Sequence, residues 1–214
     1  GRQMLQKLNY FILKNIFKEN LNLIELKKEK LNLIDKIFSL KGNIDGLTNK
    51  KYLEIINIIE REKITKIFID GSNLGFLAKK LKKFNRKISI LTFFHNVEAY
   101  FFLGLFKYVK SPKSFVVLIV NYFAELNACI HSDELICLSE NNKKQIKKLY
   151  NYKKSIHVSP ISLFDQLKDI KNLNINSNRN NKHAIFIGTN FYANKEGILW
   201  FYKYVAPYIN IDIY

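Results

Sequence analysis

The sequence contains little of what holds a disulfide-rich or turn-rich protein together. Among 214 residues there are two cysteines, three prolines and eight glycines. Cys129 and Cys137 both lie in apolar surroundings and do not form a close pair of the metal-binding type. We therefore expect buried free thiols in a reducing cytosol instead of a disulfide framework.

Long hydrophobic runs are also missing. The longest purely apolar stretches, such as FVVLIV at 115–120, are far shorter than the roughly 18–20 residues that cross a bilayer. No signal peptide is visible, and the chain does not begin with Met. We expect a cytoplasmic protein that is soluble or rests as a peripheral protein on the inner face of the cell membrane.

Acidic residues are scarce relative to basic ones. The chain has 35 Lys and Arg against 18 Asp and Glu, a net charge of +17 and a pI of about 9.7. Such a surface attracts anions: phosphates, nucleic acid or an acidic membrane. Lys, Asn, Ile, Phe and Tyr are abundant together, so A+T-rich codon usage is an alternative explanation of the excess.

Several catalytic signatures are absent. There is no His-x3-His or His-Glu-x-x-His pattern, which argues against a metal site. There is no Gly-x-Ser-x-Gly and no GKS or GKT loop, which argues against a hydrolase elbow and a P-loop nucleotidase.

Apolar residues make up 48% of the chain, enough for a substantial core. The hydrophobic pattern predicts helices alternating with short strands whose interiors are apolar, which is typical of a parallel sheet covered on both faces. In the helix expected at 50–63, the pattern places Leu53, Ile56 and Ile59 on one side. The predicted helices are 3–18, 50–63, 73–85, 97–108, 114–131, 141–151 and 197–209; the predicted strands are 21–26, 66–70, 87–94, 133–139, 155–160 and 183–190.

The domain organisation follows from a change of composition. Residues 165–182 are polar, Asn-rich and without apolar periodicity, and we interpret them as a linker between a domain at 1–164 and the start of a second one at 183–214. The second α/β unit begins without being completed, and Gly1-Arg2 leads into a helix with no strand before it. We expect a fragment that is open at both ends and lacks the first strand.

Small and polar residues follow the predicted strands. In open α/β sheets ligands bind beyond the carboxyl ends of the strands. The segments that arrive there are Asp70-Gly71-Ser72, His95-Asn96-Val97-Glu98, Ser139-Glu140 and Gly188-Thr189-Asn190. The sequence therefore predicts a polar site at one end of the sheet.

Each of these segments also has a structural explanation. The turn at Asp70 can simply cap the next helix, and Ser139 looks like an N-cap. Gly188 can permit a tight turn, although a glycine turn before a helix also lets backbone N–H groups approach phosphate. His95 alone would be a core histidine with satisfied hydrogen bonds, but its position beside Asn96 and Glu98 favours a functional role.

Two lysine-rich segments stand out, together with one aromatic stretch. On helices the lysines form solvated basic faces or attract anionic lipid. The stretch 100–120, where aromatic residues are interleaved with Lys107, Lys110 and Lys113, fits a membrane interface or a core helix. The first lysine cluster is Lys79, Lys80, Lys82, Lys83, Arg86 and Lys87; the second is Lys143, Lys144, Lys147, Lys148, Lys153 and Lys154.

These motifs, in this order, resemble a known family. The motifs that carry this resemblance are, in order, a strand ending in Asp-Gly-Ser, a basic helix, a strand ending in Phe-His-Asn-Val-Glu, a long helix with an inner Glu, and the run Ser-Asp-Glu-Leu-Ile-Cys-Leu-Ser. With them, the first part of the chain resembles the N-terminal domain of a family 4-like glycosyltransferase of the GT-B fold. Residues 185–209 resemble the start of its C-terminal domain.

The resemblance implies an α/β fold, with a Rossmann-like doubly wound parallel sheet followed by the beginning of a second Rossmann-like domain. It implies transfer from a nucleotide sugar to a glycan or lipid-linked acceptor in surface polysaccharide or glycolipid biosynthesis, with retention at the anomeric carbon and without a metal ion or other cofactor. The family's paired glutamates and diphosphate-binding Arg and Lys would follow Tyr214, so the fragment alone is expected to be inactive.

The resemblance also assigns roles to residues. His95 would contact the transferred sugar, and Asn96 and Glu98 would shape the acceptor side. The remaining substrate-binding residues that it suggests are Gly1, Asp70, Ser72, Ser139, Gly188, Thr189 and Asn190, with Gly188 and Thr189 near the donor phosphates.

Two other functions fit parts of the sequence. A basic α/β module could bind nucleic acid through its lysine faces, but the lysine runs lack the interleaved aromatics of a stacking platform, so no nucleic-acid partner is expected. A two-domain sugar-nucleotide epimerase is the other alternative, and the strand-end His-Asn-x-Glu favours the transferase over it.

Overall fold

The structure is a computed structural model that describes residues 2–27, 39, 44–161, 183–210 and 212–213. The chain divides into two compact units, Gly1–Ile161 and Ser162–Tyr214, which we call the N-terminal and C-terminal units. The predicted linker at 165–182 and the predicted substrate residue Gly1 lie outside the described residues, as does most of 31–40, a segment whose hydrophobic pattern is ambiguous.

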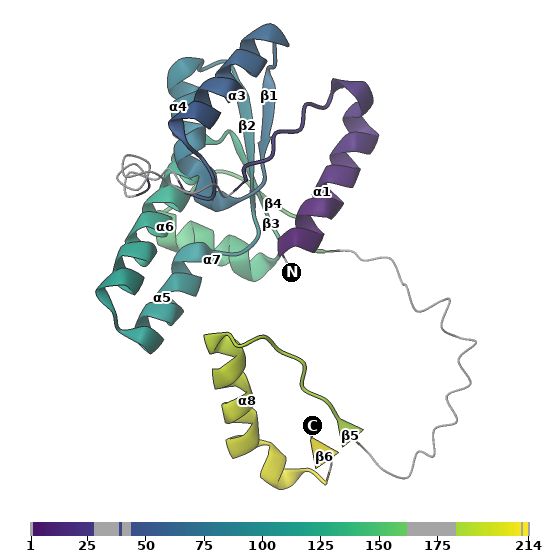
Figure 1. Cartoon of the computed structure of the whole chain (residues 1–214), viewed down its shortest axis with the longest axis vertical. Helices are drawn as coiled ribbons and strands as arrows, with labels where there is room; N and C mark the ends of the chain where they lie inside the picture. Colours follow the sequence, from purple (N-terminus) through teal and green to yellow (C-terminus); the bar gives the residue numbers. More distant parts are fainter. Residues whose placement is uncertain (1, 28–38, 40–43, 162–182, 211, 214) are drawn as a thin grey trace, which may run out of the picture. The chain divides into compact units, whose positions relative to one another are not determined.

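The N-terminal unit is built on a four-stranded parallel sheet in the order β1-β2-β3-β4 (Figure 1). The strands are β1 (Lys66–Ile69), β2 (Ser89–Phe94), β3 (Glu134–Cys137) and β4 (Ile156–Val158). They are short, and their buried positions include Ile69, Ile90 and Leu135. The prediction of an α/β fold with a parallel sheet is thus confirmed, while the described strands run in sequential order.

Helices precede and connect these strands, and neighbouring ones contact each other through side chains. They are α3 (Asn49–Arg61), α4 (Gly75–Phe84), α5 (Glu98–Val109), α6 (Pro112–His131) and α7 (Glu140–Tyr150), with a short 3₁₀ helix η2 (Ser72–Leu74) before α4. The Tyr52 hydroxyl of α3 donates to the Lys80 carbonyl of α4 at 3.4 Å. Ring contacts between Tyr122 and Tyr150, 5.4 Å apart, join α6 to α7.

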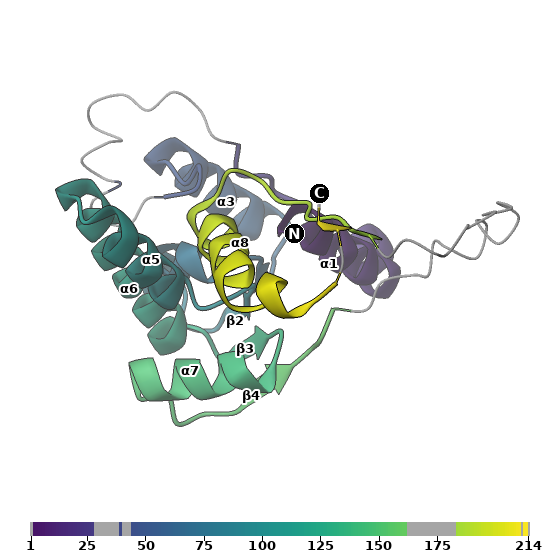
Figure 2. The same cartoon turned by 90° about the horizontal axis from the view of Figure 1, so that it is seen from below.

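Another helix of this unit, α1 (Arg2–Phe17), lies on the other side of the sheet from α6 in both views (Figures 1 and 2). A 3₁₀ turn, η1 (Lys18–Asn20), follows it. Leu5 and Asn9 are its buried residues. One helix therefore lies on the second face of the sheet, but most of its large apolar side chains, Met4, Phe11, Ile12 and Ile16, are exposed. A sheet fully covered on both faces stays a prediction.

The C-terminal unit contains β5 (His183–Ala184) paired in parallel with β6 (Asp212–Ile213). Helix α8 (Tyr192–Tyr204) and the 3₁₀ turn η4 (Ala206–Tyr208) lie between them in sequence. The strand predicted at 183–190 is thus limited to two residues. The predicted helix at 197–209 instead begins at Tyr192, five residues earlier than expected, and its last turn is the 3₁₀ segment.

Two other predictions are wrong. Residues 21–26 form no strand in the described structure, because no described strand pairs with them; Ile24 and Leu26 instead pack half-buried against the core. Leu53 does not share the buried face with Ile59, since its side chain is 60% exposed. At 100° per residue the two side chains lie about 120° apart around α3, and the buried face is formed by Ile55, Ile56 and Ile59.

The two cysteines are buried and free, as expected. Cys129 lies on α6 and Cys137 at the end of β3, and both belong to the hydrophobic cluster around α7. Burial raises the pKa of both thiols above the ordinary value. They therefore act as small apolar side chains in the core.

Two of these helices approach very closely at Gly75, the first residue of α4. A Cβ placed on Gly75 would lie 1.9 Å from the Ala124 carbonyl oxygen and 2.3 Å from the Ala128 nitrogen, both backbone atoms of α6. Backbone atoms cannot rotate away as a side chain does, so only glycine permits this approach.

We predict that Gly75→Ala lowers the free energy of unfolding by about 3 kcal/mol, because α4 and α6 must separate. Gly197→Ala in α8 is the matched control: its Cβ meets nothing within 4 Å, and alanine gains about 0.5–1 kcal/mol of helix propensity. Chemical denaturation followed by circular dichroism measures both. A Gly75→Ala protein as stable as the parent would contradict the described helix contact.

Candidate functional site

The site is formed where β1 and β2 end. The two strands are parallel neighbours, with Ile69 opposite Thr92. The residues that follow them therefore meet at the same end of the sheet, where the strands have their carboxyl ends. Nε2 of His95, after β2, lies 2.6 Å from Oδ1 of Asp70, after β1. Nδ2 of Asn9, from α1, donates to the same oxygen at 3.0 Å. The structure thus brings together two predicted site residues and adds a third that the sequence did not indicate.

The hydrogen-bonding capacity of His95 is only half used. Its side chain is 9% exposed, and its ring stands edge-on to Phe93 with centroids 5.4 Å apart. A carboxylate can only accept, so the Asp70 contact places the proton of the neutral ring on Nε2. Nδ1 is then an acceptor, and it is buried without a partner among the described residues.

A second buried acceptor follows directly in the chain. Oδ1 of Asn96 also has no hydrogen-bond partner within the described part of the chain. Buried polar atoms are rarely left unpaired, and each such atom costs about 1–3 kcal/mol. Two adjacent unpaired acceptors at the ligand end of a parallel sheet are suited to a ligand that donates hydrogen bonds.

The turns that carry Asp70 and His95 are fixed by one buried carboxylate, that of Glu125 on α6. Its Oε1 accepts from the Ser72 hydroxyl at 2.9 Å and from the Glu98 backbone N–H at 2.8 Å. Its Oε2 accepts from the Ala99 N–H at 2.9 Å and from the Tyr150 hydroxyl at 2.6 Å. Since Glu98 and Ala99 are the first two residues of α5, the carboxylate takes the place of an N-cap side chain.

Burial dominates the electrostatics of this carboxylate. Glu125 is fully buried, and burial raises the pKa of its carboxyl above the ordinary value, although its four hydrogen bonds act in the opposite direction. Burial and the charge of Glu125 also raise the pKa of Tyr150. In the sequence the signal for such a role is a single acid inside the predominantly apolar 20-residue segment that forms α6.

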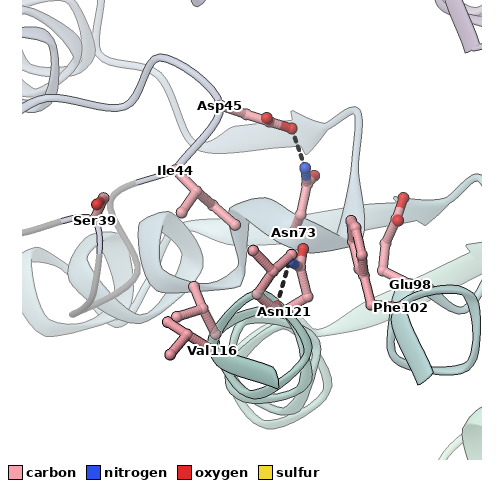
Figure 3. Close-up of a pocket in the computed structure, with 10 residues that line it drawn as sticks. Ser39, Ile44, Asp45, Asn73, Glu98, Phe102, Val116 and Asn121 are labelled. Atoms are coloured by element: carbon pink, nitrogen blue, oxygen red, sulfur yellow. Dashed lines mark hydrogen bonds between the residues drawn. The ribbon is translucent and has the colours of Figure 1, made fainter. Parts of the chain in front are cut away.

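A pocket of about 470 Å³ lies beside these turns (Figure 3). Its polar lining includes Asn73, which donates to Asp45, and Glu98 at the start of α5. Its apolar lining is formed mainly by three valines of α6, with Phe102 of α5 and Ile44. The lining residues are Ser39, Ile44, Asp45, Asn73, Glu98, Phe102, Val116, Val117, Val120 and Asn121. The pocket therefore has a carboxylate-rich end and a hydrophobic wall.

Other predicted site residues have structural contacts. Ser72 is buried and donates to Glu125. Ser139 is the N-cap of α7: its Oγ accepts from the Asn142 N–H at 3.1 Å and donates to the Asn142 Oδ1 at 2.8 Å. The cap interpretation of Ser139 is confirmed, while contact of either serine with a substrate stays a prediction.

The C-terminal unit presents its predicted residues in the segment before α8. Gly188, Thr189 and Asn190 are exposed there. Nδ2 of Asn194, in the first turn of α8, donates to the Thr189 carbonyl at 3.0 Å. This contact holds the segment against the N-terminus of the helix, where backbone N–H groups favour anions.

Part of the first lysine cluster has a structural role at the opposite end of the sheet, where β2 and β3 begin. The Lys82 ammonium contacts Oδ2 of Asp133 at 2.6 Å and the Ile88 carbonyl at 2.6 Å, and Asp133 accepts from the Ile90 N–H at 2.7 Å. Burial alone would raise the pKa of Asp133, but the hydrogen bonds from Lys82 and Ile90 outweigh it and lower the pKa. Among the residues that the structure describes, no group of three His, Cys, Asp or Glu side chains could hold a metal ion.

Comparison with known proteins gives no relative. The chain matches no protein-family model, no curated protein and no solved structure. The resemblance to glycosyltransferases and the roles that it implies therefore stay predictions.

We predict that Glu125→Gln lowers the free energy of unfolding by about 2–3 kcal/mol. Each carboxylate oxygen accepts from one backbone N–H, so whichever oxygen becomes an NH₂ leaves Glu98 or Ala99 facing a donor. Amide hydrogen exchange at these two residues should accelerate as well. Glu60→Gln, at an exposed position on α3, is the control and should stay within about 0.5 kcal/mol of the parent; equal effects of the two changes would refute the capping role.

We predict that the neutral His95 ring carries its proton on Nε2 and shows a downfield, slowly exchanging Nε2 proton in NMR spectra, since the Asp70 contact is short and the His95 side chain is only 9% exposed. Asp70→Ala should abolish that resonance. His157, whose ring is 57% exposed and 3.0 Å from Glu134, is the internal control and should not change. Protonation of the neutral His95 ring at Nδ1 would contradict the described pair.

Proposed function

We propose that the protein is a glycosyltransferase of the GT-B fold that transfers a sugar from a nucleotide-sugar donor to a glycan or lipid-linked acceptor, in the biosynthesis of surface polysaccharide or glycolipid. The observation that carries the proposal is His95: Asp70 holds one ring nitrogen, and the other is a buried acceptor without a partner in the described structure. In this proposal the four-stranded sheet belongs to a doubly wound Rossmann-like domain.

The chemistry of the two unpaired acceptors supports a sugar as the ligand. Nδ1 of the neutral His95 ring and Oδ1 of Asn96 both require donors. Sugar hydroxyls donate, whereas an ionised phosphate only accepts. We therefore assign His95 and Asn96 to hydroxyl groups of a sugar and not to the nucleotide phosphates.

The apolar environment supports the same assignment. Phe93 lies edge-on to the His95 ring, and Phe94 and Val97 are buried beside it in sequence. Sugar sites combine a few well-placed hydrogen-bonding groups with apolar walls. The Asp70 carboxylate orients the His95 ring, so the hydrogen bond to the sugar would be available without rearrangement.

The other substrate groups are assigned by chemistry within each unit. In the N-terminal unit, Glu98 at the polar end of the pocket would bind acceptor hydroxyls. In the C-terminal unit, Gly188 and Thr189 would lie near the donor phosphates, because they precede the N-terminus of α8. Transfer with retention and without a metal ion is part of the proposal.

The proposal predicts that the full-length protein releases nucleotide from a sugar nucleotide in an acceptor-dependent manner, and that His95→Ala lowers turnover about 100-fold, as the loss of one well-placed active-site hydrogen bond does in other enzymes. Mass spectrometry of the product and a coupled assay for the nucleotide measure both. His157→Ala, at an exposed position of β4, is the matched control and should keep full activity.

Two results would count against the proposal. Undiminished turnover in folded His95→Ala protein would remove the role of His95. Absence of nucleotide release with every common sugar nucleotide, in the presence of glycan and lipid-linked acceptors, would remove the transferase itself.

A further inference from the structure

The turn between α5 and α6 is an exposed part of the N-terminal unit with a definite chemical character. The two helices form an antiparallel hairpin whose turn lies away from the sheet (Figures 1 and 2). We call residues 107–116, KYVKSPKSFV, the hairpin tip. Val116 is the one tip residue in the lining of the pocket, and no tip residue lies at the polar ends of β1 and β2. Lipid binding by the tip is therefore measured separately from the proposed function.

Eight of the ten tip residues are exposed. The two others, Ser111 and Ser114, form a capping box: each side chain accepts from the backbone N–H of the other residue. Lys110 ends α5 in the left-handed conformation with φ 51°, and Pro112 occupies the first turn of α6. The tip is thus a well-defined turn that holds its outward-facing side chains in place.

The exposed side chains are of only two kinds. The apolar ones include Val109, which is 49% exposed, and Phe115, which is 48% exposed. The charged ones are Lys107, Lys110 and Lys113, and residues 99–124 contain no Asp or Glu at all. The tip therefore carries three positive charges around an apolar patch, with no acid nearby on either helix.

We propose that the hairpin tip docks on an anionic lipid surface, with its apolar side chains at the level of the headgroups and its lysines on the lipid phosphates. The charge complementarity identifies this partner: each Lys gains about 1 kcal/mol near an anionic bilayer, and apolar and aromatic side chains beside lysines are typical of interfacial segments.

The hairpin docks on the surface and does not cross the membrane. Among the helices that the structure describes, α6 is the one long and apolar enough to span a bilayer. However, Ala124, Glu125 and Ala128 are each fully buried, and Glu125 holds the start of α5. Moving α6 into lipid would break these contacts, so the part of this hairpin that can reach a membrane without unfolding is its tip.

Vesicle co-sedimentation of the full chain tests whether the three lysines of the hairpin tip bind anionic lipid. We expect binding to vesicles of phosphatidylcholine with about one third phosphatidylglycerol, and much weaker binding to pure phosphatidylcholine. The triple variant Lys107→Gln, Lys110→Gln, Lys113→Gln should weaken the anionic binding about 10- to 100-fold. The matched control is Lys144→Gln, Lys147→Gln, Lys148→Gln on α7, which removes the same charge from exposed positions.

Insertion of the apolar side chains of the hairpin tip is measured separately, by fluorescence quenching. The chain has one tryptophan, Trp200, in the C-terminal unit. In a Trp200→Phe background, Phe115→Trp reports on the tip, and brominated phosphatidylcholine in the anionic vesicles should quench its fluorescence. In the same background Phe84→Trp, at an exposed position at the end of α4, should not be quenched.

Four outcomes would overturn the proposal. The first is an equal loss of binding in both lysine variants, which would indicate attraction by overall charge alone. The second is equal binding to neutral and anionic vesicles. The third is no quenching at position 115. The fourth is self-association in sedimentation velocity that the tip variant abolishes while vesicle binding is absent, which would make the tip a contact between copies of the chain.

Discussion

The Glu125 carboxylate receives four hydrogen bonds in the interior, and they come from three other elements: η2, the start of α5 and the end of α7. A charge at this depth is costly unless every lone pair is used. Because both oxygens have two donors each, the cost is offset and α6 is tied to its neighbours in one geometry. The segments that follow β1 and β2 are consequently held in position by the buried side chain of Glu125, which lies behind the candidate site and is not part of it.

The coupling to the candidate site is direct. Oε1 alone binds Ser72, two residues after Asp70, and the N–H of Glu98, three residues after His95. One oxygen atom therefore positions both turns, and the short contact between Asp70 and His95 follows from that arrangement. Asn9 of α1 completes it from the other side of the sheet. The ring of His95 is oriented before any ligand arrives, as a preorganised site requires.

Much of this arrangement could be predicted from the sequence, because apolar strand interiors and strand-end polar residues are local signals. They indicate the parallel sheet and place His95 and Asp70 at one end of it. Asn9 could not be predicted, since its contact joins residues 61 positions apart in the chain. The strand expected at 21–26 failed for a related reason: an apolar alternating run is a strand only where a neighbour pairs with it. Glu125 was visible as an isolated acid, but its donors lie in three other segments.

The capped turn between α5 and α6 also has a mechanical consequence. Twelve residues of α5 span about 18 Å, and the helix is held at one end by Glu125 and at the other by the pair of serines at 111 and 114. A helix whose two ends are both held by hydrogen bonds does not fray, so it keeps a constant length. The length of α5 therefore fixes the distance between His95, just before the inner end of the helix, and any surface that contacts its outer end.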